Sequence, residues 1–167
     1  MKKKRHPVRL WAALALATAA ALTACGNTKL VDEERTFASD IWNRFTPEVF
    51  ELKVTDADMY FNVDFTVEVD TVLYRYDDFP MIIDIYDTDG THRHLTPVLK
   101  VRENGRWKGE QRDRYRRVEA RLFNYFAFNA PGDYRYEVKQ GTSQYDLEGI
   151  HSLRLAITEA KLDYSGL

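Results

Sequence analysis

A strict alternation of side chains between residues 60 and 70 does most to restrict the possible folds of this chain. The odd positions of this stretch are apolar and hold Phe61, Val63, Phe65, Val67 and Val69, while polar residues fill the even positions after Tyr60. Successive side chains of a strand point to opposite faces. The alternation therefore predicts a strand with one face in a core and one face in water.

The same period of two recurs along the chain. It is found at 81–85, 118–128, 134–138 and 151–157, and more weakly at 49–54 and 95–101. Turn signals separate these stretches, among them Asp89-Gly90, Asn104-Gly105 and Pro131-Gly132. Short strands at this spacing, each apolar on one face, predict an all-β fold, an antiparallel β-sandwich of about seven to eight strands. An open barrel is the alternative.

The N-terminus has the pattern of a secretion signal. Basic residues at 2–5 and 9 precede an apolar run over 10–24 and then Cys25, the single cysteine of the chain. This run has 15 residues, fewer than the ~20 that span a bilayer as a helix. Leu22-Thr23-Ala24-Cys25 matches a bacterial lipobox, so we expect residues 1–24 to be a lipoprotein signal peptide and Cys25 to carry diacylglyceryl and N-acyl groups. The alternative is an ordinary signal peptide that ends beside a chance cysteine.

One domain follows the signal. Residues 25–45 are predicted to be a lipid-anchored tether with a short helix, because the acids at 32–34 precede Phe37, Ile41 and Trp42 at helical spacing. Residues 46–162 are predicted to be the β-sandwich domain, and 163–167 a C-terminal tail. With Cys25 acylated, no thiol remains for a disulfide or a thiolate metal site.

The charge of the mature chain limits its partners. Removal of five basic residues with 1–24 leaves 19 Lys+Arg against 26 Asp+Glu, a formal charge of −7. This balance argues against a nucleic-acid partner and against general attraction to anionic lipid. The acyl groups on Cys25 must then supply the affinity for the membrane.

The segment 102–121 stands apart, with eight bases against four acids. Its basic residues and one tryptophan are candidates for docking an acidic partner by electrostatic steering: Arg106, Trp107, Lys108, Arg112, Arg114, Arg116 and Arg117. The alternative for the cations is a solvated loop and strand edge. The alternative for Trp107 is a cap over the end of the sandwich, in a tight turn formed with Gly105 and Gly109.

Signals for catalysis or metal binding are weak. Asp89-Gly90 fits a hairpin turn better than a calcium loop, because residues 95–98 lack the acids that such a loop needs. His92 and His94 would share a strand face, but a third ligand could come only from His151 or a nearby aspartate, so no metal site is expected. No phosphate loop or nucleophile elbow is present, and we expect no enzyme, no cofactor and no small-molecule substrate.

A series of motifs in register carries a family resemblance. The lipobox is followed by an aromatic-to-proline segment at 42–47, Tyr60 at the start of the long strand and Phe79-Pro80 before an apolar strand. Further motifs along the chain are Asp89-Gly90, Gly105-Arg106-Trp107-Lys108-Gly109, Pro131-Gly132-Asp133-Tyr134 and Leu147-Glu148-Gly149-Ile150. In this order they resemble the gliding-motility lipoproteins of the GldH type in the Bacteroidetes. Where the family tends to read Tyr-Pro-Tyr followed by Asn-Leu, this chain has Phe79-Pro80-Met81-Ile82-Ile83, as in a divergent member.

The resemblance implies a non-catalytic outer-membrane lipoprotein, an accessory or assembly subunit whose partners are other envelope motility or secretion-apparatus proteins. An envelope lipoprotein that binds a glycan or peptide through its sandwich is the alternative. Gly26 and Asn27 place no acid directly after Cys25, which favours the periplasmic face of the membrane.

Overall fold

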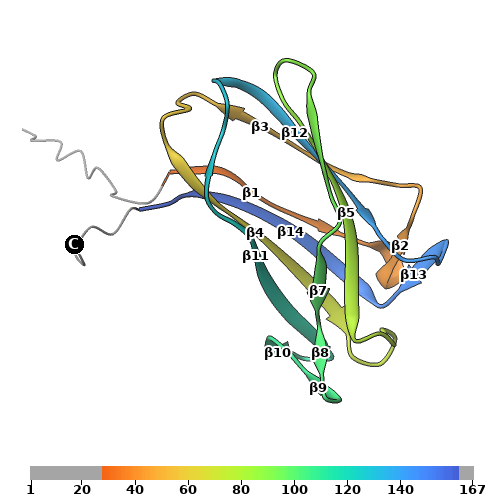
Figure 1. Cartoon of the computed structure of the whole chain (residues 1–167). Helices are drawn as coiled ribbons and strands as arrows, with labels where there is room; N and C mark the ends of the chain where they lie inside the picture. The colour runs from red at the N-terminus through yellow and green to blue at the C-terminus, as the bar shows by residue number, and fades with distance from the viewer. Residues whose placement is uncertain (1–27, 162–167) are drawn as a thin grey trace, which may run out of the picture.

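The computed structural model describes residues 28–161, which form two antiparallel sheets packed face to face (Figure 1). The first sheet has the order β1-β14-β4-β11-β10, with bounds Lys29–Thr36, Ile150–Glu159, Tyr60–Asp70, Tyr115–Ala127 and Glu110–Arg112. The second has the order β3-β12-β5-β6, with bounds Glu48–Val54, Gly132–Gln140, Asp78–Tyr86 and His92–Leu95, and β7 (Val98–Lys100) also pairs with β5. The prediction of an all-β sandwich is confirmed.

Two small sheets and one turn complete the described chain. Strand β2 (Ile41–Asn43) pairs with β13 (Asp146–Glu148), and β8 (Arg102–Glu103) pairs with β9 (Arg106–Trp107). A 3-10 turn, η1 (Ala38–Asp40), lies between β1 and β2. These short elements cover the end of the sandwich where most candidate site residues lie.

The core lies between the inner faces of the two sheets. The apolar row of β4 is buried along its whole length, as its alternation predicted. The second sheet contributes Phe50 from β3, Ile83 from β5 and Tyr136 from β12, each with no exposed surface. The alternating stretches lie in strands, except that 95–101 is divided between β6 and β7 and Phe128 follows the end of β11. A one-sided apolar row is stable only where a facing sheet covers it.

The predicted tether with a short helix is wrong for residues 29–43. Strand β1 pairs with β14 and forms an edge of the first sheet, so the sandwich begins at Lys29 rather than at residue 46. The acids of this segment lie in β1 and not in a helical turn, and two of them meet side chains of β14. Asp32 accepts from Arg154 at 2.6 Å, and Glu34 accepts from Ser152 at 2.6 Å. Long-range pairing has outweighed local propensity.

The outer face of β4 is also less exposed than expected. Thr66 is buried, and Asp64 and Asp70 are buried carboxylates. Arg121 of β11 donates from Nε and Nη2 to the two oxygens of Asp64, at 2.7 and 3.1 Å. Because β4 is the central strand of its sheet, arginine side chains of β11 lie over its polar row, and Ser152 of β14 contacts Glu68.

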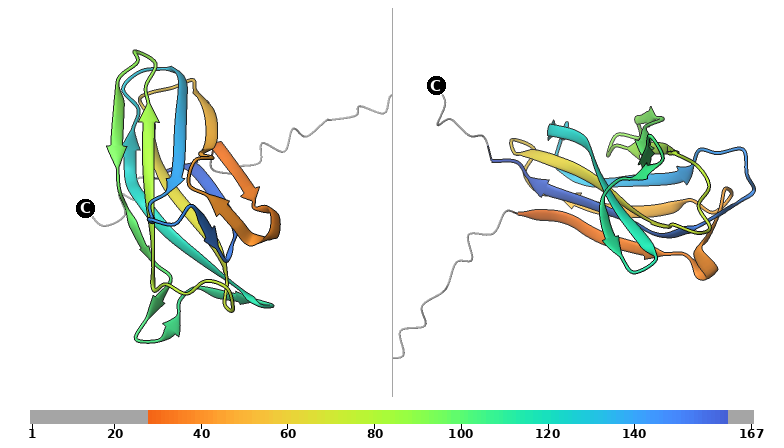
Figure 2. Two further views of the ribbon diagram at one scale, coloured as in Figure 1. Left: turned by 90° about the vertical axis from the view of Figure 1, so that its right-hand side faces the viewer. Right: turned by 90° about the horizontal axis from the view of Figure 1, so that it is seen from below.

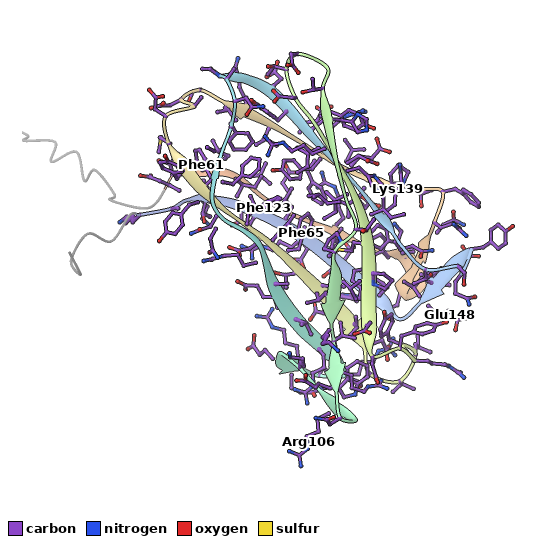
Figure 3. All side chains as sticks on the ribbon, in the orientation of Figure 1. Phe61, Phe65, Arg106, Phe123, Lys139 and Glu148 are labelled. Atoms are coloured by element: carbon purple, nitrogen blue, oxygen red, sulfur yellow. The ribbon has the colours of Figure 1, made fainter. Side chains whose placement is uncertain are left out.

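The two ends of the sandwich differ. Strand β1 begins and β14 finishes at one end, where the backbone N–H of Glu159 donates to the carbonyl of Thr28 at 2.7 Å. We call this the terminal end; Phe61 marks it in Figure 3. Strands β2 and β13 lie at the opposite end, which we call the distal end and which Glu148 marks. Figure 2 shows the β8–β9 hairpin projecting beyond the sheets.

Candidate partner-docking surface

The basic segment of the sequence forms an arm that joins the two sheets. We call residues 98–115, from β7 to the start of β11, the basic arm. Its tip is the β8–β9 hairpin, in which Asn104 (φ 51°) and Gly105 (φ 73°) are the two turn residues. Positive φ at both central positions is typical of a tight hairpin turn. The turn places Arg106 at the outermost point of the arm (Figure 3).

Trp107 lies partly in the core and partly on the arm. The Arg102 guanidinium carbon is 3.9 Å from the centre of its ring, and the indole packs against the core cluster. The neighbouring backbone is fixed as well, since the Lys108 N–H donates to the carbonyl of Val101 at 2.9 Å. The side chain therefore covers the end of the core while its outer edge stays accessible.

Arg114 points away from the arm tip into a cluster of buried acids. Its Nη2 lies 2.8 Å from Oδ2 of Asp40 and 2.7 Å from Oδ2 of Asp70, which is fully buried. Asp40 also bonds to His151 Nδ1 at 2.7 Å and accepts from the Tyr115 hydroxyl at 3.2 Å. The rings of Tyr115 and His151 stack with centres 4.3 Å apart. Arg114 thus joins η1 to the end of β4.

The electrostatics of this cluster centre on Asp40. Burial raises the pKa of its carboxyl, but hydrogen bonds from His151, Arg114 and Tyr115 outweigh burial, and the pKa lies below its ordinary value. Asp40 and Ser39 both have positive φ, at 56° and 57°. An ionised carboxylate therefore holds the chain in a conformation that most residues avoid.

The other predicted docking residues divide into two groups. Arg117 is largely buried on the outer face of the first sheet and pairs with Glu34 at 3.1 Å. Lys108 and Arg112 lie on the arm and Arg116 directly follows it in β11, with local partners in Glu103, Glu110 and the carbonyl of Gly109. The backbone of Arg106 pairs with Glu103 in the hairpin, but its side chain makes no hydrogen bond or ion pair with any residue of 28–161. The seven residues do not share one surface.

Sequence reasoning missed Asp40, Asp70 and His151 as a cluster. They come from three distant segments, and each looks like an ordinary polar residue beside a strand. Only the pairing of β14 with β4, and the turn before β2, bring them together. No local signal identifies them.

The histidines are separated by the fold. His94 Nδ1 lies 2.7 Å from Oδ1 of Asp84, His92 stacks on Tyr86, and His151 belongs to the other sheet. Within residues 28–161, no group of three or more potential ligands is placed to hold a metal ion. Asp89-Gly90 forms the predicted hairpin turn between β5 and β6.

The predicted lipidation site, Cys25, and the signal peptide lie outside the described residues. Between residues 28 and 161, no helix has the length and apolar character needed to cross a bilayer.

Comparisons with known proteins point to one family. The family model described as GldH lipoprotein matches residues 29–157. No curated protein matches the sequence. A crystal structure of dimeric latent PorU from Porphyromonas gingivalis is similar at a TM-score of 0.34 and 10% identity; the alignment covers 87% of this chain and 14% of that one.

Proposed function

This chain belongs to the GldH lipoprotein family, and on that basis we propose that it is a non-catalytic accessory subunit of gliding-motility machinery. It is anchored in the outer membrane through Cys25, faces the periplasm, and docks an acidic envelope protein through the basic arm. The family match supports the association with motility. The structure supports the choice of surface.

The docking proposal rests on one observation, the unpaired positive charge of the Arg106 side chain at the tip of the arm. The Arg106 side chain projects from the β8–β9 hairpin without a partner in the described chain, beside Lys108 and the outer edge of Trp107 (Figure 3). Arginine and tryptophan are over-represented among interface residues that dominate binding energy. A rim of this kind steers an acidic partner and speeds its arrival.

The anchor proposal concerns Cys25. Cys25→Ser should leave an uncleaved precursor or a soluble form, since the acyl groups supply the membrane affinity. Fractionation of cells that produce the variant measures this. Normal processing and retention in the outer membrane would rule out lipidation at Cys25.

The docking surface is tested by reversing charges at the tip. The double variant Arg106→Glu with Lys108→Glu should recover fewer partners when the tagged lipoprotein is purified from its native membrane, with the largest loss at low salt. The control is Lys53→Glu with Lys161→Glu, which makes the same charge change on exposed residues at the ends of β3 and β14. Equal recovery by both pairs would show that the arm is only a solvated face.

A further inference from the structure

Exposed apolar side chains gather at the distal end of the molecule. Within residues 28–161, nine large hydrophobic residues are exposed, and six of them lie at this end: Ile41, Phe45, Val72, Leu73, Tyr76 and Tyr145. We call these six the distal cap. Phe45, Val72 and Tyr145 expose 67%, 74% and 68% of their surface. Single exposed hydrophobic residues are ordinary, but a contiguous group marks an interaction site.

Three distant segments bring the cap together. Strand β2 pairs with β13, and the rings of Phe45 and Tyr145 lie beyond this pair with centres 5.6 Å apart. The loop 71–77 is held against the same end, because the Asp70 N–H donates to the carbonyl of Gly149 at 2.9 Å. Tyr76 and Arg75 line a shallow hollow with Thr142, three positions before Tyr145 in the chain. The three segments therefore lie together at the distal end.

The buried cluster behind the cap fixes its shape. Oδ1 of Asp70 accepts from the N–H groups of Val72 and Leu73 at 2.8 and 3.1 Å, while Arg114 bridges Asp70 to Asp40 in the turn before β2. Two of the three cap segments thus share one set of ion pairs. A surface held in place before binding loses little conformational entropy when a partner arrives.

We propose that the distal cap is the docking site for a different protein, one that presents an apolar patch. The proposal rests on the proposed function for one point, the anchor at Cys25. That residue precedes Thr28 by three positions, so the terminal end faces the membrane and the cap points away from it. A lipid surface cannot then be the occupant.

A second copy of the chain does not fit either. Two copies joined cap to cap around a two-fold axis would direct their terminal ends in opposite directions. Their Cys25 lipids could not enter the same membrane. The occupant is therefore a protein of another kind, reached from the side away from the bilayer.

The charges around the cap define the partner further. Asp77 and Asp78 pair with Arg102 and Lys100, and Asp146 accepts from Asn43 at 2.7 Å. Arg75 and Glu148 make no ion pair within residues 28–161, and neither do Asp146 and Arg44, whose guanidinium carbon lies 5.6 Å from the centre of the Phe45 ring. The rim therefore holds two unpaired charges of each sign, and the partner's apolar patch should carry both carboxylates and bases at its edge. Net steering is weak, and binding here should depend little on salt, unlike binding to the basic arm.

The ring geometry favours a protein over a glycan. Phe45 and Tyr145 are tilted by 46° to each other and do not form a flat platform on which a sugar ring could lie. Two tilted rings flanked by Val72 and Leu73 instead resemble the apolar centre of a protein interface.

Site-specific photo-crosslinking in the lipidated full-length chain, in native cells, tests the proposal. A photoreactive phenylalanine analogue at position 145 should give a discrete adduct with one other protein. The same analogue at position 60, an exposed tyrosine at the terminal end, should not. The crosslinked protein is identified by mass spectrometry, purified, and titrated with the detergent-solubilised full-length chain.

In that titration, Phe45→Ala with Tyr145→Ala should weaken binding by about tenfold or more, and Tyr60→Ala should leave it unchanged. Both variants should fold, because the removed rings are exposed. An adduct of two copies of this chain, an adduct with lipid or glycan, or equal adducts at both positions would each overturn the proposal. So would unchanged affinity of the double variant.

The outcomes separate this proposal from the proposed function. If only the arm variant loses binding, the proposal of docking through the basic arm stands and the proposal for the distal cap is overturned. If Cys25→Ser is stably retained in the membrane, the proposed anchor is wrong. The argument that excludes lipid and a second copy as occupants of the cap then fails too. The crosslinking result then decides the occupant directly.

Discussion

Buried aspartate carboxylates are a distinctive feature of this sandwich. Asp40, Asp64, Asp70 and Asp84 are all buried, and each meets an arginine, histidine or lysine. A buried charge is costly unless it is paired and hydrogen-bonded, so removing one partner costs more than the pair contributes when intact.

Asp40 provides a prediction for acid conditions. Its pKa in the folded chain lies below the unfolded value of about 3.9, so its contribution to stability is present above that pH and is lost as the pH falls through the folded pKa. Asp40→Asn should unfold more easily at pH 7, by about 1–3 kcal/mol, because Arg114 and His151 lose their acceptor. It should also lose less stability than the parent between pH 5 and pH 2. Urea unfolding across this range measures both effects, with exposed Asp58→Asn as control; parallel curves would contradict the assignment.

The two faces of β4 give a second prediction. Phe65→Ala should cost about 3–5 kcal/mol through lost burial and a cavity. Thr66→Ala faces the other way and should cost about 1 kcal/mol, since Thr66 is buried beneath neighbouring side chains rather than solvated. Chemical denaturation of both variants, beside exposed Lys53→Ala, checks the order. Equal losses for Phe65 and Thr66 would show that the two faces are equally well packed.

Turns set the arrangement of the elements, and the turn before β14 is tightly constrained. Gly149 has φ +85°, and a Cβ there would lie 2.4 Å from the backbone nitrogen of Tyr74. Gly90, in the β5–β6 hairpin, has φ +84° but open space around it. Both Gly→Ala changes incur the strain of a left-handed conformation, but only Gly149→Ala adds a backbone clash.

We therefore expect Gly149→Ala to lower the melting temperature several degrees more than Gly90→Ala does. It should also disturb the distal cap, because the loop 71–77 would have to move. Thermal unfolding of both variants measures the difference. Similar melting temperatures would mean that the loop yields at little cost.

The elements also show how far sequence reasoning reaches. Alternation identified the long strands because β4, β12 and β14 each need a single buried face. It failed for β1, where Asp32 and Glu34 are stabilised by partners more than 80 positions away, as in Arg117 with Glu34. It could not find the distal cap, because positions 45, 72 and 145 are joined only by the fold. Local periodicity predicts which face of a strand is buried, but it does not predict which distant segments come together.

At the scale of the whole molecule, Trp107 connects the basic arm to the core. The indole packs against the core and beneath Arg102, so Trp107→Ala should lower stability by about 1–3 kcal/mol. Arg106→Glu, one residue away on the exposed tip, should change stability by less than about 0.5 kcal/mol. Thermal unfolding beside a partner pull-down separates the roles. Unchanged stability in Trp107→Ala would make the residue a binding contact alone.

The course of β1 also determines how the molecule would bear mechanical load. A pull between the membrane and the distal cap would enter at Thr28 and run along the backbone of β1, through η1, to Phe45. A strand rises about 3.3 Å per residue, close to the full extension of a peptide chain, so β1 can lengthen very little. The compliant point is the turn at Ser39 and Asp40, which His151 and Arg114 hold closed. Tension would therefore run along the covalent backbone of β1 at the edge of the sandwich, and the core would carry little of the load.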